Sequence, residues 1–354
     1  MGVLFGPFSP LPHPVAVGKI TNKVDMGVKI EAIHLSLSFG CLCVLIERVV
    51  SSAGDQSPYY QKCVSKCTES NCSTDGWNFL SGVQPFYLQV TLWSCAEECQ
   101  YNCMWKTVDA FMERKWDVPQ FHGRWPFSRI LGLQEPASVL FSFLNFCAHF
   151  YMLKVFRKEV PKSSPMFWLW HFYAAVCLNG WFWSCIFHTR DFPFTEKMDY
   201  FCAFSMVLCS FYCMCARILN GRSKCLLVLL AAFCFFIFLH HVTFMSWVKF
   251  DYGYNMMVNI TVGIFNAVGW LSWSIYNREK MPYSSLCAYF IILVGICMLL
   301  ELADFPPVFW YFDSHSLWHL STAWLPFIFY KFLIHDCRYL LKQKYLDEKK
   351  THVN

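Results

Sequence analysis

Seven apolar stretches in the later part of the chain constrain its fold more than any other feature. Each has close to the ~20 residues with which a helix crosses ~30 Å of hydrocarbon. Helices are expected because lipid offers no partners for backbone N–H and C=O groups. Only 15% of the residues are charged, against roughly 25% in soluble domains. The stretches are residues 136–156, 166–188, 198–218, 225–245, 255–276, 283–301 and 315–335.

The distribution of Lys and Arg between these stretches predicts their orientation. Residues 157–164, 221–224, 277–282 and the tail 336–354 are rich in Lys and Arg, whereas the intervening loops are mixed or acidic. The positive-inside rule places the basic segments in the cytosol. The expected topology therefore has a luminal N-terminus, seven spans and a cytosolic C-terminus. No basic patch with interleaved aromatics is present, so nucleic acid is not expected as a partner.

The N-terminal segment has features of a secretory signal. Residues 33–46 are apolar but too short to span well, and the small residues Ser51, Ser52 and Ala53 follow. This order resembles a signal peptide with its cleavage site, which we predict near Ala53. An uncleaved anchor is the alternative interpretation. Met26 is a second candidate for the start of translation, so residues 1–53 are interpreted as an N-terminal extension and signal peptide.

Six of the twenty cysteines lie in a polar segment directly after the expected signal. An even number of cysteines in an exported segment predicts disulfides, whose pairing the sequence does not fix. A zinc site is the alternative, although its usual two-residue spacings and histidines are missing. Asn71 begins a glycosylation sequon in this segment. The six are Cys63, Cys67, Cys72, Cys95, Cys99 and Cys103.

These observations define the expected organisation of the chain. Residues 54–135 are predicted to form a luminal cysteine-rich domain, and residues 136–335 the seven-transmembrane domain. Residues 336–354 are predicted to form a cytosolic tail. The predicted fold class is an all-α membrane protein: a seven-transmembrane helix bundle with a small disulfide-rich luminal N-terminal domain.

Five polar residues lie where three of the stretches meet the membrane surface. Ser184 and His188 are four residues apart at the end of the second stretch, and Asp199 lies in the first turn of the third. His315 and His319 open the seventh stretch with the same spacing. The topology, which was assigned from Lys and Arg alone, puts all five at one depth on the luminal side. Ionisable residues in such positions indicate a functional site.

Three histidines with an open position are typical of a catalytic zinc site. His315 and His319 share one helix face, and His188 supplies a ligand from another helix. Zinc acidifies bound water, and Asp199 would accept a proton or orient a ligand. Ser184 would donate a hydrogen bond to an oxyanion. Each residue alone has a plainer interpretation, such as a hydrogen bond within its helix or a favourable charge at a helix N-terminus.

Other polar residues are weaker candidates. Asp191 competes with Asp199 as the acidic partner. His240, His241 and Asp251 would either line the same cavity or anchor their helices at the interface. These alternatives remain open from the sequence alone.

Several long motifs resemble one known group of proteins. "QFHGRWPFSRILGLQEPASVLFSFLN", "FHTRDFPFTEKMDYF" and "LADFPPVFWYFDSHSLWHLST" resemble the CREST superfamily of seven-span membrane hydrolases. Within it, residues 55–340 are similar to the Per-like family of post-GPI-attachment remodelling factors. The resemblance implies a Zn²⁺ ion held by three ligands. It also implies two catalytic residues. The ligands would be His188, His315 and His319, and the catalytic residues Asp199 and Ser184.

The resemblance also implies a substrate and a location. The expected activity is phospholipase A2-type hydrolysis of the unsaturated sn-2 acyl ester of GPI-anchored proteins, giving lyso-GPI, in the Golgi membrane. The expected partners are GPI-anchored proteins and membrane lipid. A ceramidase-like amide hydrolase and a non-catalytic lipid-binding receptor or chaperone are the alternatives.

Overall fold

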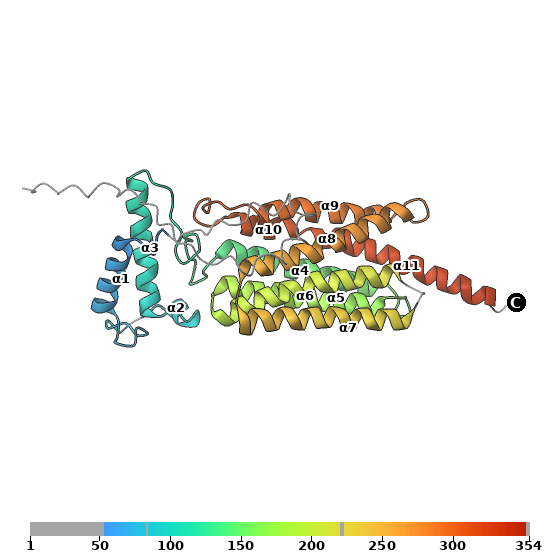
Figure 1. Ribbon diagram of the computed structural model, residues 1–354, viewed down its shortest axis with the longest axis horizontal. Coiled ribbons are helices and arrows are strands. Elements are labelled where there is room, and N and C mark those ends of the chain that lie inside the picture. Colours follow the sequence, from blue (N-terminus) through green and yellow to red (C-terminus); the bar gives the residue numbers. More distant parts are fainter. Residues whose placement is uncertain (1–52, 83, 220–222, 352–354) are drawn as a thin grey trace, which may run out of the picture. The chain divides into compact units, whose positions relative to one another are not determined.

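The computed structural model describes residues 53–82, 84–219 and 223–351 (Figure 1). All described residues belong to one compact unit. The predicted signal segment and Met26 lie outside the described residues. Within these residues the regular structure is helical, and the β-bridges are isolated ones.

Two antiparallel helices joined by disulfides form the cysteine-rich part of the chain. They are α1 (Pro58–Asn71) and α3 (Cys95–Glu113), with the short helix α2 (Phe86–Val90) in the connection between them. Separations of four or five positions along the chain place the cysteines near one side of each helix. Pairing therefore runs in antiparallel order, as Cys63–Cys103, Cys67–Cys99 and Cys72–Cys95. The disulfide prediction is confirmed, and none of these six sulfurs remains as a thiolate for a metal.

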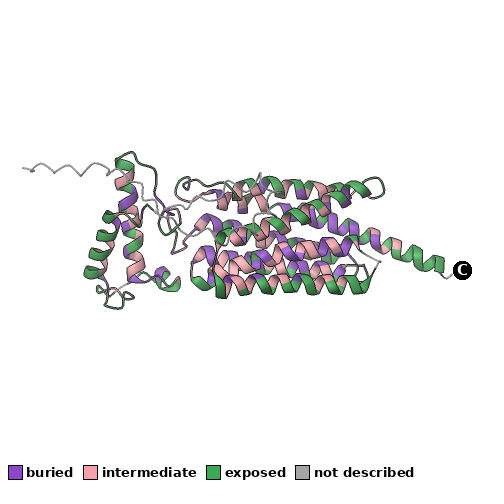
Figure 2. Cartoon of the chain, in the orientation of Figure 1, coloured by how far each residue is buried: buried purple, intermediate pink, exposed green. Residues whose placement is uncertain are grey.

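Five helices in the described residues are long and apolar enough to cross a membrane. Each matches one of the predicted stretches to within a few residues, and the protein is an all-α membrane protein. Figure 2 shows exposed positions along most of α7, as expected for a helix whose surface faces lipid. The five are α4 (Pro136–Glu159), α6 (Pro193–Ile218), α7 with the π-helical turn η1 (Lys224–Val248), α8 (Tyr252–Asn277) and α9 (Ser284–Glu301).

The second predicted stretch forms α5 (Phe167–Thr189), which is not among those five. It is long enough, but Asn179, Ser184, His188 and several Trp and Tyr residues lower its hydropathy. Because α5 packs against α4 and α6, much of its surface faces protein rather than lipid. A helix in this position tolerates polar side chains at little cost.

The seventh predicted stretch is divided between two helices, α10 (Ser314–Thr322) and α11 (Leu325–Thr351). The single helix expected over 315–335 is thus interrupted. Pro326 explains the interruption, because its ring lacks an N–H and clashes with the preceding turn, so it fits only near a helix start. Beyond the predicted span α11 continues without interruption to Thr351, through most of the segment expected to be a tail.

The core of the helix bundle contains a buried ion pair. Arg217 at the end of α6 forms two hydrogen bonds to Asp336 on α11, at 2.6 and 2.8 Å. Tyr283 donates a third bond to the same carboxylate at 3.0 Å. The Asp336 side chain is fully buried, so this contact fixes α11 against α6 without competition from water.

Candidate metal centre

Three histidine side chains from two helices converge at one point. His188 lies in the last turn of α5, and His315 and His319 lie on α10. The Nε2 atom of His319 is 3.3 Å from Nε2 of His188 and 2.9 Å from Nε2 of His315. One ring nitrogen of each lies within 4.8 Å of the others. The structure thus brings together the three residues that the sequence singled out as ligands.

Local contacts hold α10 in the position that this convergence requires. Asp313 caps its start by accepting a hydrogen bond from the Ser316 N–H at 2.8 Å. At the other end, the buried amide of Asn145 on α4 donates to the main-chain oxygen of His319 at 2.7 Å. The helix carrying two of the imidazoles is therefore fixed at both ends.

Carboxylates bind the outer nitrogens of two of the three rings. Glu135 Oε2 lies 2.7 Å from Nδ1 of His188, and Glu301 Oε2 lies 2.7 Å from Nδ1 of His315. The sequence interpretation missed both glutamates. Each glutamate lies at the end of an apolar stretch. The rule that ionisable residues beside membrane spans indicate a functional site, which identified the histidines, could therefore have identified them too.

Glu135 contacts His188 through its main chain as well as its side chain. Its N–H donates to the His188 oxygen at 3.0 Å, so it sets both the backbone and the ring of this residue. Burial opposes ionisation of this carboxyl, but His188 and then Arg124, 3.6 Å away, lower the pKa of Glu135 to about 2. The carboxylate therefore stays charged and continues to accept the imidazole proton.

The donor set fits a divalent metal ion such as zinc. A carboxylate at Nδ1 makes that atom the protonated one, which leaves a lone pair on Nε2. In His188 and His315 these lone pairs face the same Nε2 atom of His319. A hydrogen on that atom can satisfy one of them, whereas a bound cation satisfies all three nitrogens at once. Carboxylate–histidine pairs of this kind are the usual support of zinc ligands. The buried Nδ1 of His319 has no hydrogen-bond partner among the described residues.

Ser184 and Asp199 lie beside the imidazoles. Ser184 is buried one turn before His188, and its hydroxyl lies 3.0 Å from that of Ser142 on α4. Asp199 is half-buried on α6 and interacts electrostatically with His188 and His315. No hydrogen bond engages its carboxylate within the described part of the chain. A carboxylate in this position is available to a water molecule or a substrate.

Asp191, the alternative acidic partner, is engaged elsewhere. Arg124 Nη2 contacts its carboxylate at 2.6 Å and that of Glu196 at 3.3 Å. Burial raises the pKa of Asp191, although Arg124 acts in the opposite direction. Asp191 therefore belongs to a charge cluster around Arg124, which also contains Glu135, and it interacts electrostatically with His188 as well.

The weaker sequence candidates lie outside the histidine cluster. His241 is buried against the rings of Phe204 and Tyr254. Asp251 caps the start of α8 by accepting from the Tyr254 N–H at 3.0 Å and pairs with Lys249. Both have structural roles in this arrangement.

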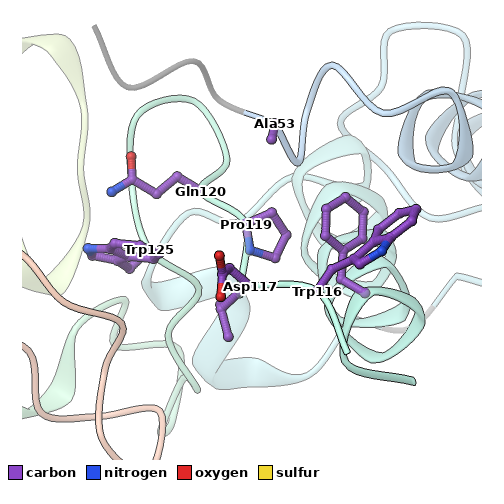
Figure 3. Close-up of a pocket in the computed structure, with 8 residues that line it drawn as sticks. Ala53, Trp116, Asp117, Pro119, Gln120 and Trp125 are labelled. Atoms are coloured by element: carbon purple, nitrogen blue, oxygen red, sulfur yellow. The ribbon is translucent and has the colours of Figure 1, made fainter. Parts of the chain in front are cut away.

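A surface pocket of about 300 Å³ lies away from the histidines, at the end of α3 and the loop that follows (Figure 3). Trp116, Pro119 and Trp125 line it, and Asp117 is the one carboxylate in its wall. None of the five predicted site residues borders it. Nothing in this pocket suggests chemistry that would compete with the imidazole cluster.

The fold and the histidine cluster define a helical membrane protein with a candidate metal centre and a disulfide-linked N-terminal region. The Per1-like family matches residues 85–337, and the chain belongs to this family. It is 45% identical to post-GPI attachment to proteins factor 3 of Drosophila melanogaster, covering 82% of this chain and 90% of that protein. The GPI-specific phospholipase A2-like PGAP3 of Homo sapiens is 44% identical, covering 82% and 91%. No solved structure matches the chain significantly.

Proposed function

We propose that this chain is a zinc-dependent hydrolase that removes the unsaturated sn-2 acyl chain from the lipid of GPI-anchored proteins. The convergence of three imidazoles, two of them held by carboxylates, is the observation that carries the proposal. The names of these relatives, which refer to GPI and to phospholipase A2, support the choice of substrate. Zinc at His188, His315 and His319 would supply a Lewis acid to the reaction.

The side chains beside the imidazoles have roles that ester hydrolysis requires. As water attacks the ester carbonyl, a base must accept a proton and later return it to the leaving alkoxide. We assign this transfer to Asp199, which interacts electrostatically with His188 and His315; such a transfer typically contributes about 10²–10⁴-fold. The hydroxyl of Ser184 has one hydrogen, which it can donate to the oxygen that becomes negative when Ser142, 3.0 Å away, acts as the donor between the two serines. Removal of one such donor costs about 10²–10³-fold.

Metal analysis of the purified chain tests the ligand set directly. The wild-type chain is expected to retain zinc, and His188→Ala is expected to lose it while remaining folded. His122→Gln is a matched control, because the side chain of His122 is 64% exposed and lies outside the cluster. Equal zinc content in His188→Ala and the wild type would refute the assignment of ligands.

Lipid analysis in cells tests the substrate. Cells that carry His315→Ala are expected to keep unsaturated chains on GPI-anchored proteins, whereas His122→Gln restores saturated ones. Release of sphingosine from ceramide by the purified chain would instead favour an amide hydrolase. Full function in an Asp199→Asn, Ser184→Ala double variant would favour a lipid-binding receptor or chaperone.

The proposal includes an orientation and a location. The Lys and Arg distribution supports a luminal cysteine-rich region, residues 54–135, and a cytosolic tail, residues 336–354. The Golgi location rests on the resemblance to post-GPI-attachment remodelling factors alone. Asn71 is exposed, and its amide donates to the main-chain oxygen of Cys67 at 3.0 Å. A glycan on Asn71, detected as a mobility shift after glycosidase treatment and lost in Asn71→Gln, would place α1 in the lumen. Cytosolic protease access to α1 in sealed vesicles would contradict this orientation.

A further inference from the structure

A set of large apolar side chains lies exposed on α2 and the neighbouring turn 130–133. Phe86 and Leu131 are 77% and 71% exposed. The turn packs against α2, because Gly132 approaches Tyr87 and Thr91 closely and its oxygen accepts from the Trp93 indole at 2.8 Å. The exposed side chains of both segments therefore form one surface, which we call the α2 patch. It consists of Phe86, Tyr87, Val90, Leu92, Ile130 and Leu131.

The backbone of the α2 patch is strained at two leucines. Leu92 and Leu131 have φ angles of 58° and 51°, in the left-handed region that Gly and Asn adopt more easily. Neither leucine gains burial in return, since they are 56% and 71% exposed. Strain of this kind persists at positions that serve a function. At both positions an exposed apolar side chain occupies a backbone conformation that Asn or Gly would fit better.

The α2 patch is held close to the ends of two membrane helices. Leu131 precedes Pro136, where α4 begins, by five residues, at most about 17 Å of extended chain. Two hydrogen bonds join the segment to the end of α5, from Gln134 N to Thr189 O and from Glu135 N to His188 O, both 3.0 Å. The patch is therefore continuous with the surface at which α4 and α5 meet the membrane boundary.

A cation–aromatic stack further fixes this position. The Arg129 and Arg190 guanidinium groups lie over the Trp93 ring, at 3.2 and 3.6 Å from its centre. Arg190 follows α5 directly and also pairs with Glu97 on α3. Side chains from the α2 connection, from α3 and from the end of α5 are thus joined at one point, and α2 cannot move far from the membrane boundary.

We propose that the α2 patch inserts into the membrane leaflet at whose surface α4 begins and α5 ends. Contiguous exposed apolar patches mark interaction surfaces when they are large. Aromatic and aliphatic side chains at the edge of a bilayer bury their apolar surface at the boundary of headgroups and acyl chains. Continuity with the two spans makes lipid the occupant. The inference does not depend on the hydrolase proposal.

Photo-crosslinking to lipid tests the inference in the full chain. The photoreactive residue p-benzoylphenylalanine replaces Phe86 in one variant and Tyr59 in another, and each is reconstituted in phosphatidylcholine vesicles with alkyne-tagged acyl chains. Tyr59 is an aromatic of α1 and is 54% exposed. It is a matched control because the disulfides hold α1 on one side of α3. Another side of α3 faces the membrane helices, since Glu97 contacts Arg190 and Trp105 contacts Trp310.

The α2 patch is expected to acquire several-fold more lipid label at position 86 than the control does at position 59. Equal labelling of both positions would overturn the proposal, and so would crosslinks at position 86 to a second copy of the chain in place of lipid. The double variant Leu92→Asn, Leu131→Asn provides an independent comparison. Its unfolding temperature is expected to stay at or above that of the parent chain, because Asn suits the left-handed backbone, while lipid labelling at position 86 falls several-fold. Unchanged labelling in this variant would also overturn the proposal.

Discussion

The two carboxylate–histidine pairs are expected to contribute unequally to metal affinity. Glutamine in place of either glutamate keeps an oxygen that accepts from Nδ1 but removes the negative charge that strengthens the bond. Loss of such a partner typically costs about 10–100-fold in metal affinity. The burial of each pair then decides where in this range the loss falls.

Solvent exposure differs sharply between the two pairs. The side chain of His188 is 2% exposed and that of Glu135 is 10% exposed, so water cannot replace a weakened carboxylate there. The side chain of His315 is 35% exposed, and water can take over part of the role of Glu301. We therefore expect Glu135→Gln to lose about 100-fold in zinc affinity and Glu301→Gln about 10-fold, the two ends of the usual range.

Chelator competition on the detergent-purified full chain measures both affinities. Glu196→Gln is the matched control, since Glu196 shares Arg124 with Glu135 but contacts none of the three imidazoles. Its zinc affinity is expected to equal that of the wild type. A larger loss in Glu301→Gln than in Glu135→Gln would refute the reasoning from burial, and an equal loss in the Glu196→Gln control would show that the effect is not specific to the pairs.

Three further predictions concern stability, measured as unfolding of the purified chain in detergent. Asp336→Ala leaves Arg217 buried without its partner, and the free energy of unfolding should fall by about 3–5 kcal/mol. Replacing Cys72 and Cys95 by Ala removes a bridge across 23 residues, which the chain-entropy relation values at about 3.4 kcal/mol. Gly132→Ala should lower stability by more than about 1 kcal/mol, because φ is 83° and a Cβ would lie 3.0 Å from the Tyr87 oxygen.

Two of these predictions have a control variant within the same chain. Arg338→Gln breaks an ion pair with Glu159 that is largely exposed, so it should cost under about 1 kcal/mol. Gly82→Ala introduces a side chain at a similar φ of 80° but into open space, and should cost less than Gly132→Ala. Equal losses of stability in Asp336→Ala and Arg338→Gln would contradict the role given to burial. Equal losses in Gly132→Ala and Gly82→Ala would contradict the role given to steric contact. For the disulfide, identical unfolding of the double Ala variant and the wild type would contradict the entropy argument.

Much of the helical architecture could be predicted because lipid reduces the choice of structure. An apolar run of about 20 residues has few alternatives to a helix, and five predicted stretches match observed helices closely. Hydropathy describes α5 less well, since this helix faces protein. The division at Pro326 could have been predicted from the missing N–H of proline. The continuation of α11 to Thr351 could not be predicted from hydropathy, because the last part of this helix is polar and hydropathy identifies only apolar helices.

The meeting of the three histidines followed from topology, but the atoms that support them did not. Spacing showed that His315 and His319 share a helix face, and the Lys and Arg distribution put His188 at the same depth. Glu135 supports the ring of His188 through a hydrogen bond between residues 53 positions apart in the sequence. No local sequence pattern predicts such a contact. Disulfide order was similarly inaccessible until the antiparallel packing of α1 and α3 was known.

The Cys72–Cys95 bridge isolates the segment between its two sulfurs from the rest of the cysteine-rich helices. Substitutions between these cysteines leave the α1–α3 pairing covalently intact, whatever they do to α2. Within the proposal that the α2 patch contacts lipid, substitutions in this loop can therefore change that contact while the disulfide-linked helices keep their arrangement.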